Sequence, residues 1–212
     1  SLKPGEKVSL MGPTGIRAKI SDEHETVLII GDQLALPLLH SYGNALRKKG
    51  NRVIFCSTTD EEFPQKIINQ CSDVIIQASS STNCIDNLLQ YDATHPTIPL
   101  ADVDRIYLIG TTCLLKEFQT VRQTLLKTVF IKNPEIHASV YSTMQCMLKG
   151  VCAQCLQWQI DPETGKRTKA VFACSWPEQP LELIDINNIN ERQQQNRLLE
   201  TLNSMWLGQQ TG

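Results

Sequence analysis

The chain has 212 residues, of which 41% are hydrophobic, and carries a formal net charge of −2 at pH 7. This length and composition suffice for one large globular domain or two small ones, while the scattered, nearly balanced charges disfavour nucleic acid as a partner. The longest apolar runs, such as 27–30, are far shorter than the roughly 20 residues of a membrane helix, so no membrane span is predicted. Eight cysteines outside a small secreted scaffold, with no recognisable signal peptide, lead us to expect a cytoplasmic protein.

The first stretch of the chain is rich in turn signals. Residues 2–15 alternate short strand-like stretches with proline and glycine, and they are too short to form a core of their own. We therefore expect residues 1–20 to be the leading edge of a fragment, a linker that follows a domain upstream.

From about residue 26, apolar strand-like segments alternate with helical ones. This pattern predicts an α/β domain over 21–140, a parallel sheet flanked by helices on both faces. Strands are expected at 27–30, 52–56, 74–76, 105–109 and 136–140, and helices at 34–49, 61–69 and 114–129. Such sheets bind ligands outside the carboxyl ends of their strands, which here means the turns that begin at Gly31, Cys56 and Gly110.

The alternation stops after residue 140, and a small Cys-rich module is expected over 141–212. Two strand-like stretches around a turn predict a β-hairpin, and a later polar stretch with apolar residues at helical spacing predicts one terminal amphipathic helix. The hairpin strands are expected at 156–160 and 168–173, the turn at 161–165, a loop at 185–190 and the helix at 191–207.

Four cysteines in this module, Cys146, Cys152, Cys155 and Cys174, have the spacing C-x5-C-x2-C-x18-C. Four clustered thiolates favour a metal, and an iron-sulfur cluster is the preferred reading because plant-type ferredoxins use a similar C-x4-C-x2-C run with a distant fourth cysteine. Zinc is the serious competitor, although Cys174 supplies only half of a second pair. Disulfides fit poorly. The other cysteines lack mutual spacing and are expected to be small buried hydrophobic residues: Cys56, Cys71, Cys84 and Cys113.

These motifs resemble the C-terminal part of ferredoxin-reductase superfamily electron-transfer subunits. The similarity is to the dihydroorotate dehydrogenase electron-transfer subunit and the small subunit of NADH-dependent reduced ferredoxin:NADP oxidoreductase. The resemblance is carried by Met144-Gln-Cys146, Gly150-Val-Cys152-Ala-Gln-Cys155, Phe172-Ala-Cys174, Leu2-Lys-Pro-Gly5 and Gly12-Pro-Thr-Gly15. It covers nearly the whole chain but begins after most of the flavin-binding barrel, so that residues 1–20 correspond to the barrel exit.

The resemblance implies an electron relay between an upstream flavin domain, with its FAD, and an electron-accepting or electron-donating subunit. By position, the four clustered cysteines would hold a 2Fe-2S cluster, and Gly31, Gly110, Thr111 and Thr112 would face a nucleotide. The family has several glycines after its first strand, whereas this chain keeps only Gly31 and follows it with Asp32. A carboxylate beside a phosphate at about 4 Å costs on the order of 4 kcal/mol at an effective dielectric of 20, so direct NAD(P) binding is disfavoured.

The leading hypothesis is therefore the electron-transfer fragment of an NAD(P)H- and flavin-dependent oxidoreductase with a 2Fe-2S cluster. The alternative is a zinc-stabilised structural or interaction module whose nucleotide domain is degenerate. A domain that binds NAD(P)H directly despite the lost glycines ranks last.

Overall fold

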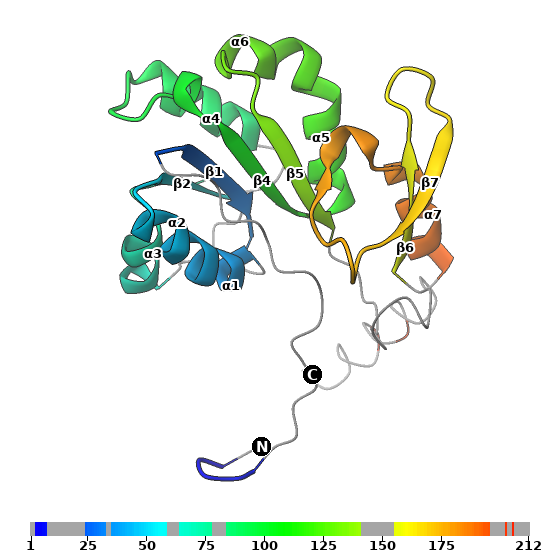
Figure 1. Ribbon diagram of the computed structural model, residues 1–212, viewed down its shortest axis with the longest axis horizontal. Helices are drawn as coiled ribbons and strands as arrows, with labels where there is room; N and C mark the ends of the chain where they lie inside the picture. Colours follow the sequence, from blue (N-terminus) through cyan, green and yellow to red (C-terminus); the bar gives the residue numbers. More distant parts are fainter. Residues whose placement is uncertain are drawn as a thin grey trace.

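The computed structural model describes residues 3–7, 24–32, 35–58, 64–77, 84–140 and 155–195, together with Leu202 and Met205. Its main feature is a six-stranded sheet in the order β3-β2-β1-β4-β5-β8 (Figure 1). The first five strands run parallel, and β8 is antiparallel to β5. Their bounds are β1 Thr26–Gly31, β2 Arg52–Ser57, β3 Val74–Gln77, β4 Arg105–Gly110, β5 Glu135–Val140 and β8 Gln179–Pro180.

Continuous apolar runs explain the central strands. Every residue of β1 is buried, as expected for a parallel strand covered on both faces. Alternate side chains of β1 enter different cores: Leu28 and Ile30 pack with one cluster, Val27 and Ile29 with the other. Each of these fully buried side chains contributes about 1.5–3 kcal/mol of hydrophobic free energy.

Helices cover both faces of the sheet. One core includes side chains from α4 and α5, and the other includes side chains from the helical segment 36–48 and from α3. The segment 36–48 consists of α1, the π-helical η2 and α2. The bounds are α1 Leu36–Leu38, η2 Leu39–Gly43, α2 Asn44–Lys48, α3 Gln65–Cys71, α4 Cys84–Ala93, η4 Leu100–Asp102, α5 Thr112–Val121, η5 Arg122–Leu126 and α6 Lys127–Val129.

Side chains hold the amino ends of the strands in place. Asp104 accepts hydrogen bonds from the backbone N–H of Thr26 at 2.8 Å and from Lys132 Nζ at 2.7 Å. Asp73 likewise accepts from the N–H of Val53 at 2.8 Å. Asp104 and Asp73 thus hold the amino ends of the strands through hydrogen bonds, which is a structural role. The candidate site lies at the opposite, carboxyl end of the sheet.

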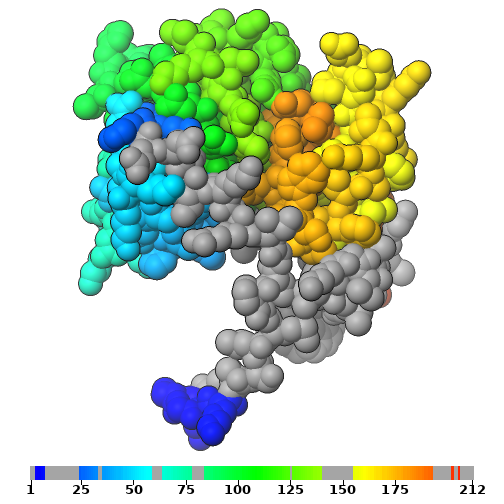
Figure 2. All heavy atoms as spheres, viewed as in Figure 1, coloured from blue at the N-terminus to red at the C-terminus, as the bar shows by residue number. Residues whose placement is uncertain are grey.

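The C-terminal part adds a hairpin and a helix to one edge of the sheet. Strands β6 Leu156–Ile160 and β7 Arg167–Phe172 pair antiparallel, and η6 Leu181–Leu183 and α7 Ile186–Gln195 follow β8. In the space-filling view, the hairpin (yellow) lies against the 173–185 segment (orange), which lies against the sheet (Figure 2). Among the described residues, every helix is too short or too polar to cross a membrane.

The expected α/β architecture is confirmed, with local differences. The segment 185–190, expected to be a loop, is helical from Ile186, because Asp185 Oδ1 accepts the N–H of Asn188 at 2.9 Å and caps the helix. Helix α3 begins at Gln65, after Pro64, rather than at residue 61, which lies outside the described residues. Helix α4 and strand β8 were not expected.

Candidate functional site

Among the described strands, the sheet has its topological switch point between β1 and β4. The chain moves outward from β1 to β2 and β3 and then returns to place β4 on the other side of β1. Gly31 ends β1 opposite Ile109, the residue before Gly110 at the end of β4. The two predicted glycines therefore lie at neighbouring strand ends, at the place where open α/β sheets bind ligands.

Tight packing explains the glycine at position 31. A Cβ atom there would lie 2.5 Å from the Cβ of Ala35 and 2.7 Å from the carbonyl oxygen of Ile109. Ala35 is fully buried, and its N–H donates to the carbonyl of Asp32 at 2.9 Å, so Ala35 lies against the end of β1. Gly31 is thus required by the close approach of protein atoms, whether or not a phosphate also comes near.

The helix that follows β1 presents few backbone N–H groups that could bind an anion. Helix α1 has only three residues, has Pro37 in its first turn, and continues as the π-helical η2. Proline has no N–H to donate. A dinucleotide-binding turn relies on the aligned N–H groups at a regular helix start, and this arrangement is not present at residues 35–43.

The other strand end, at β4, leads into a longer helix. Thr111 is the N-cap of α5, and its hydroxyl accepts the N–H of Leu114 at 3.4 Å. The hydroxyl of Thr112 donates to Oδ1 of Asn190 in α7, at 2.5 Å. Both threonines expected to face a nucleotide are therefore engaged with protein groups, and Thr112 ties the terminal helix to the switch point.

Two of the four predicted metal ligands lie at the open end of the hairpin. Cys155 immediately precedes β6, and its carbonyl accepts the N–H of Ala173, the residue before Cys174, at 3.0 Å. Cys155 is buried and Cys174 is half-buried. This open end lies at the same end of the molecule as the arrowheads of β4 and β5 (Figure 1).

The other two predicted ligands, Cys146 and Cys152, lie outside the described residues. Within the described part of the chain, no three or more His, Cys, Asp or Glu side chains are grouped so that they could hold a metal ion. Cys155 and Cys174 flank the paired strands β6 and β7, and cysteine thiolates are the ligands that soft metals and iron-sulfur clusters prefer.

A buried chain of amides connects the hairpin to the sheet edge. Gln179 of β8 donates to Oε1 of Gln157 at 2.7 Å and accepts from Nε2 of Gln159 at 3.1 Å, and all three side chains are buried. Arg192 of α7 also donates to the carbonyl of Leu156, the residue next to Cys155. These bonds fix the cysteine-bearing end of β6 relative to β8 and α7.

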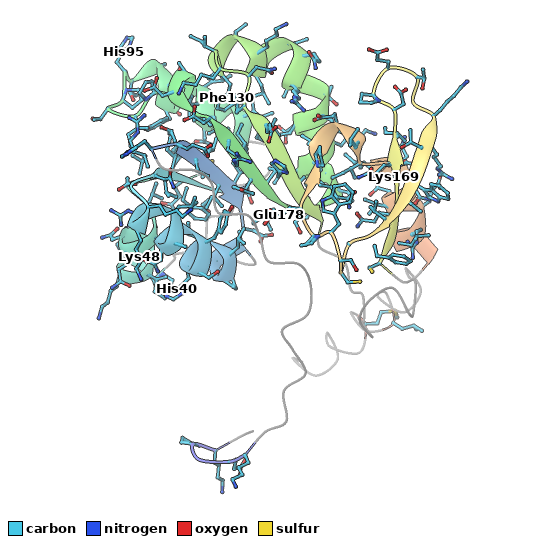
Figure 3. All side chains as sticks on the ribbon, viewed as in Figure 1. His40, Lys48, His95, Phe130, Lys169 and Glu178 are labelled. Atoms are coloured by element: carbon cyan, nitrogen blue, oxygen red, sulfur yellow. The ribbon has the colours of Figure 1, made fainter. Side chains whose placement is uncertain are left out.

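Around β7, exposed cations lie over aromatic rings. Lys169 Nζ lies 4.6 Å from the centroid of Trp176, and the Arg167 guanidinium lies 5.8 Å from that of Trp158. Figure 3 labels Lys169 on this strand. Trp176 follows Cys174 by two residues, so the Lys169 contact joins β7 to the segment that carries Cys174.

A titratable group lies near the carboxyl ends of β4 and β5, where Figure 3 labels Glu178. Burial raises the pKa of Glu178, and the nearby charges of His137 and Arg105 only partly offset that effect. On the same face of the sheet the hydroxyl groups of Tyr42 and Tyr107 lie 2.6 Å apart, and burial and this hydrogen bond raise the pKa of Tyr42. This face of the sheet therefore carries polar side chains that are largely shielded from water.

The remaining cysteines differ in part from expectation. Cys56, Cys71 and Cys84 are buried as expected. Cys113 is exposed, so its predicted burial is wrong: it lies in the first turn of α5, whose buried face is formed by Leu114, Leu115 and Phe118. Cys56 and Cys84 lie in contact, which their separation of 28 residues gave no means of predicting.

No family model matches the chain. Uncharacterized protein RP006 of Rickettsia prowazekii (strain Madrid E) is 28% identical over 207 residues, which are 96% of this chain and 22% of that protein. The chain therefore spans only about a fifth of the length of this relative.

Among solved structures, a chain of NADH-dependent reduced ferredoxin-NADP oxidoreductase, described in terms of flavin-based electron bifurcation, matches with a TM-score of 0.68. The match has 18% identity and covers 94% of this chain and 68% of that chain. The ferredoxin reductase in carbazole 1,9a-dioxygenase (FAD apo form) is 21% identical over 56% of this chain and 33% of that chain; its TM-score of 0.35 carries no argument. The chain has a ferredoxin-reductase-like fold: a mostly parallel sheet flanked by helices, with a hairpin module at its edge.

Proposed function

We propose that this chain is the electron-transfer portion of a flavin- and iron-sulfur-dependent oxidoreductase. The observation that carries the proposal is the position of Cys155 and Cys174 on paired segments at the open end of a hairpin, beside a ferredoxin-reductase-like sheet. When bound on Cys146, Cys152, Cys155 and Cys174, a 2Fe-2S cluster would supply one-electron transfer between an upstream flavin domain and a partner subunit.

The described residues support this assignment by what they do around the two cysteines. The amide chain through Gln179 and the Arg192 bond to Leu156 fix the backbone at Cys155, and a fixed backbone keeps thiolates at a set spacing. Burial of Cys155 excludes water from its sulfur. Solvent exposure is among the factors that set the potential of an iron-sulfur centre.

The switch point favours a degenerate nucleotide site. Asp32 adds a negative charge at the end of β1, α1 is short and contains Pro37, and the Cβ position of Gly31 is already filled by protein atoms. Each feature weakens phosphate binding there. We therefore expect electrons to reach the chain from the FAD of the upstream domain, with no direct NAD(P) contact. Calorimetric titration with NADH and NADPH should give no binding heat, and saturable binding of either would contradict this part of the proposal.

Metal analysis tests the central claim. We expect protein purified without oxygen to contain two irons and two acid-labile sulfides per chain, with visible absorption that falls on reduction. Stoichiometric zinc without sulfide would instead show a structural or interaction module.

Single substitutions to alanine assign the ligands. Cys155→Ala and Cys174→Ala should each abolish the visible absorption, as should the same change at Cys146 and Cys152. Cys113→Ala is the matched control, because this exposed thiol lies on α5 and should leave the spectrum unchanged. An unchanged spectrum in all four ligand variants would overturn the assignment.

A further inference from the structure

Two buried thiols lie in contact outside the four-cysteine motif. The Sγ atoms of Cys56 and Cys84 are 3.7 Å apart, and both side chains are fully buried in the core that lies beneath α4 and α5. Cys56 lies near the carboxyl end of β2, and Cys84 is the first residue of α4. A disulfide has an S–S bond of about 2.05 Å, so the sulfurs need to approach by roughly 1.7 Å.

The closed arrangement protects both thiols. The hydrogen bond with Cys56 and burial both raise the pKa of the Cys84 thiol. Since the thiolate is the reacting form, the pair reacts slowly with oxidants while the core is closed. The start of α4 is an element end, and helix ends open more readily than strand centres. Opening there hydrates Cys84, restores its ordinary acidity and admits a small oxidant.

We propose that Cys56 and Cys84 are a disulfide-forming pair, oxidised by a small hydroperoxide. The thiolate of one cysteine attacks the peroxide oxygen, which gives a sulfenic acid and releases hydroxide. The second thiol then attacks that sulfur, an S–S bond forms, and the sulfenic oxygen leaves as water. Overall, two thiols and one hydrogen peroxide give one disulfide and two waters: the cysteines lose two electrons and the peroxide gains them.

The bond would covalently join β2 to the start of α4, where the two thiols are now in non-covalent contact. Cys56 directly precedes Ser57, which pairs with Gly31 at the end of β1. A disulfide at this position therefore anchors the start of α4 next to the switch point, and it closes a loop between residues 28 apart in the sequence. The oxidised chain should open less readily at α4.

Peptide mapping of the full chain tests the proposal. Folded protein is treated with hydrogen peroxide, remaining thiols are blocked, and the chain is cut with trypsin and Asp-N under non-reducing conditions. Cleavage after Lys66 and before Asp73 separates Cys71 from Cys84, so the linked partner is identified without ambiguity. We expect a peptide containing Cys56 joined to one containing Cys84, with the loss of two hydrogens.

Matched variants make the result specific. Cys71→Ser removes another buried thiol and should leave the linkage intact, whereas Cys84→Ser should abolish it; Cys84→Ala serves if the buried hydroxyl prevents folding. Oxidation should also raise the melting temperature by several degrees in the wild-type chain and in Cys71→Ser, but not in the Cys84 variants.

Cys113 reports whether the oxidant is active, because this thiol is exposed. Oxidised Cys113 with no Cys56–Cys84 linkage would overturn the proposal, as would a linkage that forms only in denaturant. Neither thiol belongs to the four-cysteine motif, so this result is independent of the metal analysis.

Discussion

Replacement of Gly31 by alanine tests the packing at the switch point most directly. The added methyl group would lie 2.5 Å from the Cβ of Ala35 and 2.7 Å from the Ile109 carbonyl oxygen. Both neighbours are held in place, Ala35 by full burial and Ile109 by the β-sheet register, so neither can move away cheaply. Overpacking of this kind costs about 1–3 kcal/mol of the free energy of unfolding. For a chain of this size, that corresponds to a fall in the melting temperature of roughly 2–12 °C.

Thermal and urea denaturation of the nucleotide-free protein, followed by far-UV circular dichroism, measure this loss. Gly110→Ala is the first control: its new Cβ would lie 2.7 Å from Cδ2 of Leu114, the end of a flexible side chain that can rotate away, so the loss should be smaller. Gly165→Ala is the second, since its surroundings are open but its φ of 66° strains an alanine, at about 1–2 kcal/mol.

The comparison separates packing from ligand binding. If Gly31→Ala were as stable as the wild-type chain without any nucleotide, the steric reasoning would be refuted, and the glycine would have to be explained by the approach of a ligand. An equal loss of stability in Gly31→Ala and Gly110→Ala would also contradict the steric reasoning, because the rigid neighbours of Gly31 should cost more stability than the flexible Leu114 side chain.

Three further predictions concern one buried polar side chain, Gln179, and two partly buried carboxyl groups, Asp104 and Glu178. Gln179→Leu leaves the amides of Gln157 and Gln159 without their partner and should cost about 1–3 kcal/mol for each unsatisfied group, measured by urea denaturation; no measurable loss would show that water replaces the bonds. Asp104→Asn should lower stability at neutral pH by about 1–3 kcal/mol. Burial opposes ionisation of Asp104, but its bonds to Lys132 and to the Thr26 N–H hold its pKa below the usual value, so this stability is present above about pH 4 and is lost as pH falls through the folded-state pKa. Glu178→Gln should change the pH dependence of stability in the opposite direction, because burial raises the pKa of Glu178. The stability of the wild-type chain should fall as pH rises from about 4.3 to the folded-state pKa, and the stability of the variant should fall less over the same pH range. A parallel pH profile for the wild-type and either variant would contradict the corresponding assignment.

The parallel sheet could be predicted from the sequence because its strands are long apolar runs. Strand β1 is buried on both faces, so its apolar residues are consecutive and easily recognised. Strand β8 has only two residues, one of them Pro180, and gives no such signal. Helix α4 buries only Cys84, Ile85 and Leu88 within a polar sequence, so its helical period is weak. The start of α7 did have a signal, because Asp185 is a good N-cap residue.

For the candidate site, features that depend on local sequence spacing could be predicted, whereas contacts between segments distant in the sequence could not. The hairpin was predicted from its own strands and turn, and it places Cys155 opposite Ala173, the residue before Cys174. The Cys56–Cys84 contact depends on how α4 packs on β2, which no spacing encodes. The amides that join the hairpin to the sheet could not be predicted either, because glutamines are usually surface residues. They form a buried network only where β6 packs against β8.

The way the hairpin is held has a consequence for the order in which the protein is made. A two-stranded hairpin is at best marginally stable in water, so β6 and β7 depend on the groups that brace them. Those groups, Gln179, Asp185 and Arg192, all follow the hairpin in the chain, and Asp185 binds Arg167 at 2.9 Å. On the ribosome, the sheet from β1 to β5 can therefore form first, and the hairpin segments that carry Cys155 and Cys174 become fixed only when the last of the described helices has emerged.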